Sequence, residues 1–468
     1  MPTLIKNGRI VTAVDDCVAD ILIEGGRIRS IGRDLAAGPE VEVHDAAGLL
    51  VLPGGVDVHT HLDSATPTAS TVDDFASGTR AAAFGGTTTV VDYCTPRPGE
   101  SLLAGLADWH RRSESACVDV GAHMIVLDVE PGTLSEMKTL VQREGVSSFK
   151  FFMAYPGALM LEDGALFQAL RAAGALGALS CVHAENGPVI QALVRLALAQ
   201  GHLAPRYHAL TRPPILEGEA AQRALELAEL AGAPLYIVHL SSAQALAAVA
   251  RARSRGRPVF AETCPQYLLL DEGEYERPGF EGAKFVMSPP LRAAEHPRQL
   301  WRGLQTGDLQ TVATDHCAFC FEAKPHGLRH SKQLGIDDFS RIPNGAPGVE
   351  TRLPLLYDAA VVQRGFSLHR FVDLVATAPA RLFGLFPRKG RLAVDSAADI
   401  VLFAPAERWT VRAADHHSRA DHSLYEGREV TGRVNKVFLR GQCLVDGARW
   451  LGREGIGQYL MRGASGCL

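Results

Sequence analysis

The sequence predicts an α/β fold, a (β/α)8 TIM-like barrel with a small β-sandwich domain formed by both chain termini. Short apolar segments alternate eight times with Ala- and Leu-rich stretches of helical character in the middle of the chain, a pattern typical of a parallel barrel. Both ends of the chain consist instead of short alternating strands. The alternative is a doubly wound sheet, but no Gly-rich phosphate loop follows any strand to support a nucleotide-binding version.

The chain opens with strand-like residues. Segments 4–11, 19–26 and 27–32 alternate apolar with charged residues and are separated by turns, which predicts a small antiparallel sheet. Pro53-Gly54-Gly55 ends this pattern. We therefore expect residues 1–52 to form the N-terminal part of the β-sandwich.

The barrel is expected over residues 53–385. Its eight candidate strands end near His61, Asp92, Val126, Phe152, His183, His239, Thr263 and Asp315. Helical stretches between them include 73–84, 101–113, 134–143, 163–176, 218–231 and 243–254. Because the strands of such a barrel are parallel, their carboxyl ends meet at one mouth, where active sites of this fold lie.

The last part of the chain returns to strands. Segment 398–403 is one, and 434–441 with 442–447 resembles a hairpin. We expect residues 386–450 to complete the β-sandwich. Residues 451–468 would form a C-terminal tail that docks on a neighbouring subunit.

Composition excludes several classes of protein. Apolar residues make up 47% of the 468 residues, enough for a sizeable core. The net charge of -5 and the lack of a basic run argue against a nucleic-acid partner. No long uncharged apolar stretch suggests a membrane span, and the first 16 residues lack a signal-peptide core.

Nine scattered cysteines fit a cytoplasmic protein, and the Cys317-x-x-Cys320 pair is interpreted as incidental because no second pair accompanies it.

Polar side chains stand at the ends of five candidate barrel strands. His59 and His61 are two residues apart on the first strand, so both point to the same side. The others are Lys150, His183, His239 and Asp315, on the fourth, fifth, sixth and eighth strands. One strand-end histidine is more often scaffolding than a ligand. Their joint occurrence at one mouth predicts a metal centre.

Lys150 is the informative member of this set. An ammonium group beside divalent cations is disfavoured, and burial lowers the pKa of a lysine toward the neutral amine. A neutral amine reacts with carbon dioxide to give an anionic carbamate with two oxygens, which can bridge two metals. As N6-carboxylysine, Lys150 would complete a binuclear centre that activates water and polarises a carbonyl.

Several motifs of the chain match those of a known family. They are residues 54–63, 83–88, 148–150 with 153–155, 183–186, 239–242, 287–292, 314–317 and 342–345. Together they give the chain a resemblance, over nearly its whole length, to the dihydropyrimidinase and D-hydantoinase family of cyclic amidases, within the amidohydrolase superfamily. It implies hydrolysis of the cyclic amide bond of dihydropyrimidines (dihydrouracil, dihydrothymine) and 5-substituted hydantoins, giving N-carbamoyl amino acids, in a cytoplasmic homotetramer active in pyrimidine degradation.

The resemblance also implies roles for single residues. One metal ion, usually zinc with manganese as an alternative, would bind His59, His61 and Asp315. The other would bind His183 and His239, with carbamylated Lys150 bridging the two. Asp315 would be the proton shuttle for attack by the metal-bridging hydroxide, and Tyr155 would donate to the oxyanion. Ser288 and Asn344 match positions that clasp the cyclic amide substrate.

Other activities remain open. Dihydroorotases place an arginine-containing stretch after the first histidine pair, whereas this chain has Leu62-Asp63-Ser64. An allantoinase-like or other cyclic amidase is the alternative, followed by a non-catalytic scaffold of the same fold. A one-metal deaminase would not need Lys150. Small residues at 64–66, with Phe152 and Leu159 on the fourth-strand loop, suggest a roomier substituent pocket on the side of the first loop.

Overall fold

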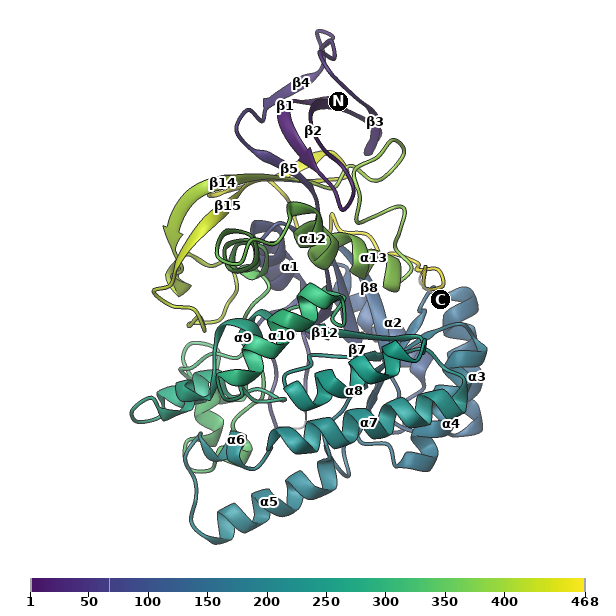
Figure 1. The fold of residues 1–468 in the computed structure, drawn as a ribbon, viewed down its shortest axis with the longest axis vertical. Helices are drawn as coiled ribbons and strands as arrows, with labels where there is room; N and C mark the ends of the chain where they lie inside the picture. Colours follow the sequence, from purple (N-terminus) through teal and green to yellow (C-terminus); the bar gives the residue numbers. More distant parts are fainter. Residues whose placement is uncertain (1, 67, 467–468) are drawn as a thin grey trace.

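The structure, a computed structural model, describes residues 2–66 and 68–466 (Figure 1). The purple N-terminal strands and the yellow-green C-terminal strands lie together at one end of the molecule, and the barrel with its helices fills the other (Figure 1). None of the helices in the described part of the chain is long and apolar enough to span a membrane. The final two residues of the expected tail lie outside the described residues.

Eight parallel strands form the barrel, in sequence order around the sheet. They are β6 (Gly55–Thr60), β7 (Thr87–Cys94), β8 (Asp119–Ile125), β9 (Ser148–Phe152), β10 (Leu179–His183), β11 (Leu235–Ile237), β12 (Val259–Thr263) and β13 (Thr311–Val312). A parallel bridge between Thr60 and His316 joins the first strand to the segment after the last. The sheet thus closes on itself, and the predicted (β/α)8 barrel is confirmed.

Helices follow the strands and cover the barrel (Figure 1). The α-helices of the barrel region are α1 (Phe75–Phe84), α2 (Leu102–Ser113), α3 (Pro131–Arg143), α4 (Asp163–Ala175), α5 (Gly187–Ala199), α6 (Tyr207–Leu210), α7 (Pro214–Ala231), α8 (Ala243–Ser254), α9 (Pro265–Leu269), α10 (Glu295–Thr306), α11 (Arg352–Leu356), α12 (Leu368–Val372) and α13 (Ala378–Leu382). Short 3₁₀ segments are Glu272–Glu276, Glu281–Phe285, Leu328–His330, Lys332–Gly335, Phe339–Arg341 and Ala413–Asp415, and π-helical turns span Tyr357–Val362 and Asp373–Thr377.

Local sequence sets where these helices start and stop. The side chain of Asp74 accepts a hydrogen bond from the Ser77 amide at 2.8 Å and caps α1, and Ser242 caps α8 in the same way. Such caps satisfy amides that lack a partner inside the helix. Gly232 ends α7 in the left-handed conformation, with φ of 65°, which glycine adopts without a steric penalty.

Both termini build a second sheet. Its strands are β1 (Thr3–Val11), β2 (Asp16–Glu24), β3 (Arg27–Gly32), β4 (Glu42–Asp45), β5 (Leu50–Pro53), β14 (Ile400–Thr410), β15 (Glu429–Leu439), β16 (Gln442–Asp446) and β17 (Arg449–Trp450). Strand β5 joins the two ends of the chain, because it pairs in parallel with β1 and antiparallel with β14. The predicted β unit from both termini is confirmed, and its predicted C-terminal hairpin is the antiparallel pair β15–β16.

The described part of the tail packs against its own barrel. Tyr459 forms a parallel bridge with Val120 of β8. Beyond it, the buried guanidinium of Arg462 donates to the carbonyl of Ala122 and to the Ser148 hydroxyl. The tail therefore supports strands β8 and β9 from within the same chain.

Candidate metal centre and substrate site

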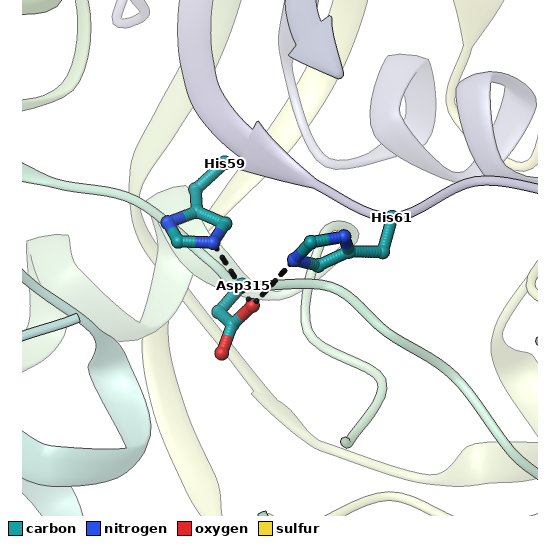
Figure 2. A group of neighbouring side chains, drawn as sticks. All are labelled: His59, His61 and Asp315. Carbon is teal, nitrogen blue, oxygen red and sulfur yellow. Dashed lines mark ion pairs between the residues drawn. The ribbon is translucent and has the colours of Figure 1, made fainter. Parts of the chain in front are cut away.

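His59, His61 and Asp315 converge at the mouth of the barrel (Figure 2). His59 Nε2 lies 3.2 Å and His61 Nε2 3.3 Å from Asp315 Oδ1. Both histidines come from the end of β6, where the alternation of a strand turns them to the same side. Asp315 lies three residues past β13 with φ of 52°, so the chain leaves the extended conformation before it presents the carboxylate. Potential ligand atoms of the three residues lie within 4.8 Å of one another.

A second pair of histidines lies beside this group. His183 ends β10, and its Nδ1 is 2.9 Å from Nε2 of His239. The predicted sixth strand stops at Ile237, and His239 follows it with φ of 37°. The rings of His59 and His239 have centroids 5.3 Å apart. The two groups of histidines are therefore neighbours in one site.

Lys150 points into the barrel from β9 and is 1% exposed. Its Nζ lies 4.6 Å from the ring centroid of Tyr93 and 5.2 Å from that of Phe152. Burial lowers the pKa of Lys150 to about 8, against the opposing attraction of nearby carboxylates. After burial, its charge is the next largest influence that lowers the pKa of His59 and of His239.

Glu262 supports the site and was not identified from the sequence. Its Oε1 contacts Nδ1 of His59 and accepts the backbone N–H of His239 at 3.0 Å, and its Oε2 accepts the Tyr236 hydroxyl at 2.8 Å. Burial raises the pKa of Glu262 to about 8. The sequence does contain a sign of this role, because Glu262 is an acid inside the apolar segment that forms β12, and a buried acid needs hydrogen-bond partners.

Tyr93 is a second residue that the sequence reading missed. Its ring centroid lies 4.7 Å from that of His59 and 5.1 Å from that of His61, stacked on the latter. The same ring contacts Lys150. Tyr93 therefore packs the first histidine pair against the lysine. Nothing in its sequence context distinguishes it from an ordinary core aromatic.

The three predicted substrate residues also meet. Burial raises the pKa of Tyr155 to about 12, although the nearby side chains of Ser288 and Asn344 act to lower it. The Tyr155 ring centroid is 5.5 Å from that of His183, so the phenol borders the histidine cluster. A cavity of about 280 Å³ opens beside Tyr155, with Glu185 and Arg212 among its lining residues.

The residues present fit divalent metal ions. His59 Nε2 is buried and, although Asp315 Oδ1 lies 3.2 Å away, it makes no well-aligned hydrogen bond to any described residue. Burial lowers the pKa of His59 and of His239 well below the ordinary value, which keeps both imidazoles neutral and able to coordinate. Four imidazoles with a carboxylate and an amine form a nitrogen and oxygen donor set suited to zinc and similar ions.

Comparisons with known proteins agree with this geometry. The amidohydrolase family profile matches residues 50–444. The D-hydantoinase of Geobacillus stearothermophilus is 47% identical over 100% of this chain and 98% of its own length, and that of Streptomyces coelicolor is 48% identical over 98% of each. The crystal structure of dihydropyrimidinase from Brevibacillus agri superposes with a TM-score of 0.96 at 47% identity, covering 99% of both chains. The chain therefore belongs to the amidohydrolase family and is an enzyme of its D-hydantoinase and dihydropyrimidinase group.

Proposed function

We propose that the protein opens the rings of dihydrouracil, dihydrothymine and 5-substituted hydantoins by hydrolysing the cyclic amide bond, giving N-carbamoyl amino acids. The supporting observation is the cluster of four histidines, Asp315 and Lys150 at one barrel mouth. It occurs in a chain that is 47% identical over its full length to a D-hydantoinase. This similarity to D-hydantoinases and the presence of all six proposed metal-site residues argue against the scaffold alternative.

Divalent metal ions belong to the chemistry of this family and fit the donor set. We propose two ions, zinc with manganese as the alternative. His59, His61 and Asp315 would hold one, and His183 with His239 the other. When bound, such ions supply an activated water and polarise the amide carbonyl.

Lys150 would bridge the two ions as N6-carboxylysine. A pKa of about 8 leaves part of this lysine as the neutral amine near neutral pH. The amine nitrogen forms a bond to the carbon of carbon dioxide and releases a proton, which gives a carbamate with one negative charge. Burial at 1% exposure protects this group from water.

Asp315 would move the proton. Its Oδ1 faces both imidazoles of the first pair, which places the carboxylate among the proposed metal ligands. The carboxylate accepts a proton as water attacks the amide carbonyl, and it returns this proton to the leaving ring nitrogen. No covalent intermediate with the protein is required.

Tyr155 would stabilise the negative charge that develops on the carbonyl oxygen. Its pKa of about 12 keeps the phenol protonated over the working pH range, so the hydroxyl remains a hydrogen-bond donor to the oxyanion. Ser288 and Asn344, whose side chains lie near this hydroxyl and act to lower the pKa of Tyr155, would orient the ring of the substrate.

Two wider proposals accompany the reaction. We propose that residues 53–385 form the catalytic unit and that the protein acts as a cytoplasmic homotetramer. The cysteines in the described part of the chain are all free thiols, as suits a reducing compartment. Exposed Val189 and Leu196 on α5, together with Ile215 at the start of α7, provide apolar surface for subunit contacts.

The test is ring opening of dihydrouracil and hydantoin by chelated protein, and by protein resupplied with zinc or manganese and bicarbonate. Lys150→Ala is measured beside Lys284→Ala, because Lys284 is a partly exposed lysine that pairs with Glu281 and lies over the Phe321 ring, away from the proposed ligands. We expect activity to require metal and Lys150 but not Lys284. Activity that survives chelation would refute the proposed centre. Two bound metals without turnover of either ring would favour allantoin or another cyclic amide instead.

A further inference from the structure

A second buried lysine lies outside the metal centre. Lys332 is 0% exposed and begins a 3₁₀ segment in the long connection after β13. Its Nζ donates to the carbonyl oxygens of Val286 at 2.7 Å, Pro343 at 2.6 Å and Gly345 at 2.6 Å. An ammonium group has three hydrogens, so these three bonds use all of them.

The three carbonyls belong to the two segments that reach Tyr155. Val286 lies two residues before Ser288, while Pro343 and Gly345 stand on either side of Asn344. The Gly345 amide also donates to the Val286 carbonyl at 3.1 Å. One ammonium group therefore joins the Ser288 segment to the Asn344 segment at their bases.

Packing fixes both ends of this connection. A Cβ added to Gly345, whose φ is 145°, would lie 2.3 Å from the Cys317 carbonyl. A Cβ added to Gly335, at the end of the segment that carries Lys332, would lie 2.3 Å from the Ile342 amide. The backbone approaches too closely at both points to admit a side chain, so the ammonium has little freedom to shift.

Lys332 forms no ion pair with a carboxylate among the described residues. The ring centroid of Phe319 lies 5.6 Å from its Nζ. Burial lowers the pKa of Lys332 to about 7, whereas three short bonds to carbonyls favour the protonated form. A buried charge without a counterion is costly. An apolar side chain would fill the same space at lower cost if the position served stability alone.

The ammonium also polarises the peptides that it binds. The Pro343 carbonyl and the Asn344 N–H belong to one peptide group. Because the Lys332 ammonium donates to this carbonyl oxygen, the N–H becomes a stronger donor. This N–H belongs to the residue whose side chain lies near Tyr155 and acts to lower its pKa. Position and polarity of the Asn344 segment thus both depend on Lys332.

We propose that Lys332 is a positioning residue for recognition of the substrate ring. It sets the spacing between the Ser288 and Asn344 segments that receive the –CO–NH–CO– edge shared by dihydropyrimidines and hydantoins. It acts through these segments and does not touch the reacting atoms. The inference rests on the proposed function and adds a determinant of ring binding that is separate from the metal centre.

Kinetics of Lys332→Met and Lys332→Gln test this proposal, with dihydrouracil, hydantoin and a 5-phenyl-substituted hydantoin as substrates. Metal content and thermal unfolding are measured on the same samples. We expect Lys332→Met to lower kcat/KM roughly 10- to 100-fold, the effect of a small misplacement of binding groups. The rise in KM should be equal for all three rings, and metal content should be unchanged. Lys332→Gln keeps an N–H donor and should recover part of the loss.

Lys389→Met is the matched control. Lys389 is also a buried lysine, but it pairs with Asp119 and Asp399 between the barrel and the terminal sheet. Its loss should lower the unfolding temperature and leave KM unchanged. This control separates the loss of a buried lysine from the loss of this particular contact.

Several outcomes overturn the inference. Wild-type kinetics in either folded Lys332 variant would do so, as would a loss that depends on the ring substituent or accompanies loss of metal. Failure of both variants to fold would assign Lys332 a structural role only. An inactive wild-type enzyme would instead refute the proposed function itself, and this inference with it.

Discussion

Glu262 offers a direct test of how the metal ligands are held. Its carboxylate contacts Nδ1 of His59, and an Nδ1–H donated there leaves Nε2 of the same ring free to coordinate. The same oxygen holds the backbone of His239 at 3.0 Å. One carboxylate thus orients a ligand in each half of the proposed centre, so we examine the isosteric substitution Glu262→Gln.

The expected magnitude follows from these bonds. Above pH 8, where the Glu262 carboxyl is ionised, the neutral side-chain amide introduced by Glu262→Gln can still accept from both N–H groups that Oε1 accepts, so the change weakens two charge-assisted hydrogen bonds without removing them. A charge-assisted bond exceeds a neutral one by about 1 kcal/mol, which gives a total of about 1–3 kcal/mol. Metal affinity should therefore fall by roughly 10- to 100-fold, as is typical for the loss of an outer partner of a ligand.

The assay is competition between the protein and a chelator of known affinity, followed by metal analysis. Glu217→Gln is the control, because Glu217 is a buried glutamate bonded to Ser241 and Arg292 and makes no contact with a proposed ligand. Its loss should reduce stability and leave metal affinity unchanged. Equal metal affinity in wild type and Glu262→Gln would refute the role assigned to this carboxylate.

Three further substitutions test other parts of the structure. Tyr155→Phe should lower kcat by about 10²- to 10³-fold with retained metal content, the effect of losing one oxyanion donor; an unchanged kcat in steady-state assays would exclude that role. Burial acts to raise the pKa of Asp73, but hydrogen bonds, led by that of His316, lower it from 3.8 to about 2. The stabilisation from the ionised Asp73 carboxylate is thus complete above about pH 4 and is lost as the pH falls through 2. Asp73→Asn should therefore remove about 2 kcal/mol of the acid-dependent part of the unfolding free energy, measured by urea titrations at several pH values. Arg462→Met should cost about 2–4 kcal/mol in the same assay at pH 7, because buried acceptors such as the Ser148 hydroxyl lose their donor; a change below 0.5 kcal/mol would show that the tail is dispensable.

Much of the fold could be predicted because its elements are encoded locally. The eight strands stop within three residues of the positions expected from apolar runs, and helix α8 has the expected bounds of 243–254. The secondary structure after β13 was harder to predict from the sequence. It breaks into short α-helical pieces and two π-helical turns, whose boundaries depend on packing against the barrel and not on hydrophobic period.

The residues of the candidate site could be predicted from the sequence for a different reason. Histidine, lysine and aspartate at strand ends are rare enough in apolar segments to stand out, and the barrel topology brings strand ends together. Glu262 was missed because the reading of β12 stopped at Thr263 and ignored the acid inside the strand. The contacts of Lys332 were hidden because its partners are backbone carbonyls, which every residue has.

Backbone conformation at the site shows where local reasoning ends. Tyr155, His239 and Asp315 all have positive φ, of 64°, 37° and 52°. This region costs a residue with a side chain of order 1 kcal/mol or more, so surrounding structure must hold it. For His239 that support is the bond from its amide to Glu262. For Asp315 it is the next residue, since the His316 carbonyl accepts the His61 amide at 2.8 Å across the closing seam of the barrel. These contacts join strands that are distant in the sequence, so they cannot be predicted from the local sequence. The strained geometry of the ligands is therefore a property of the closed barrel, and variants that loosen the seam should impair metal binding before they unfold the chain.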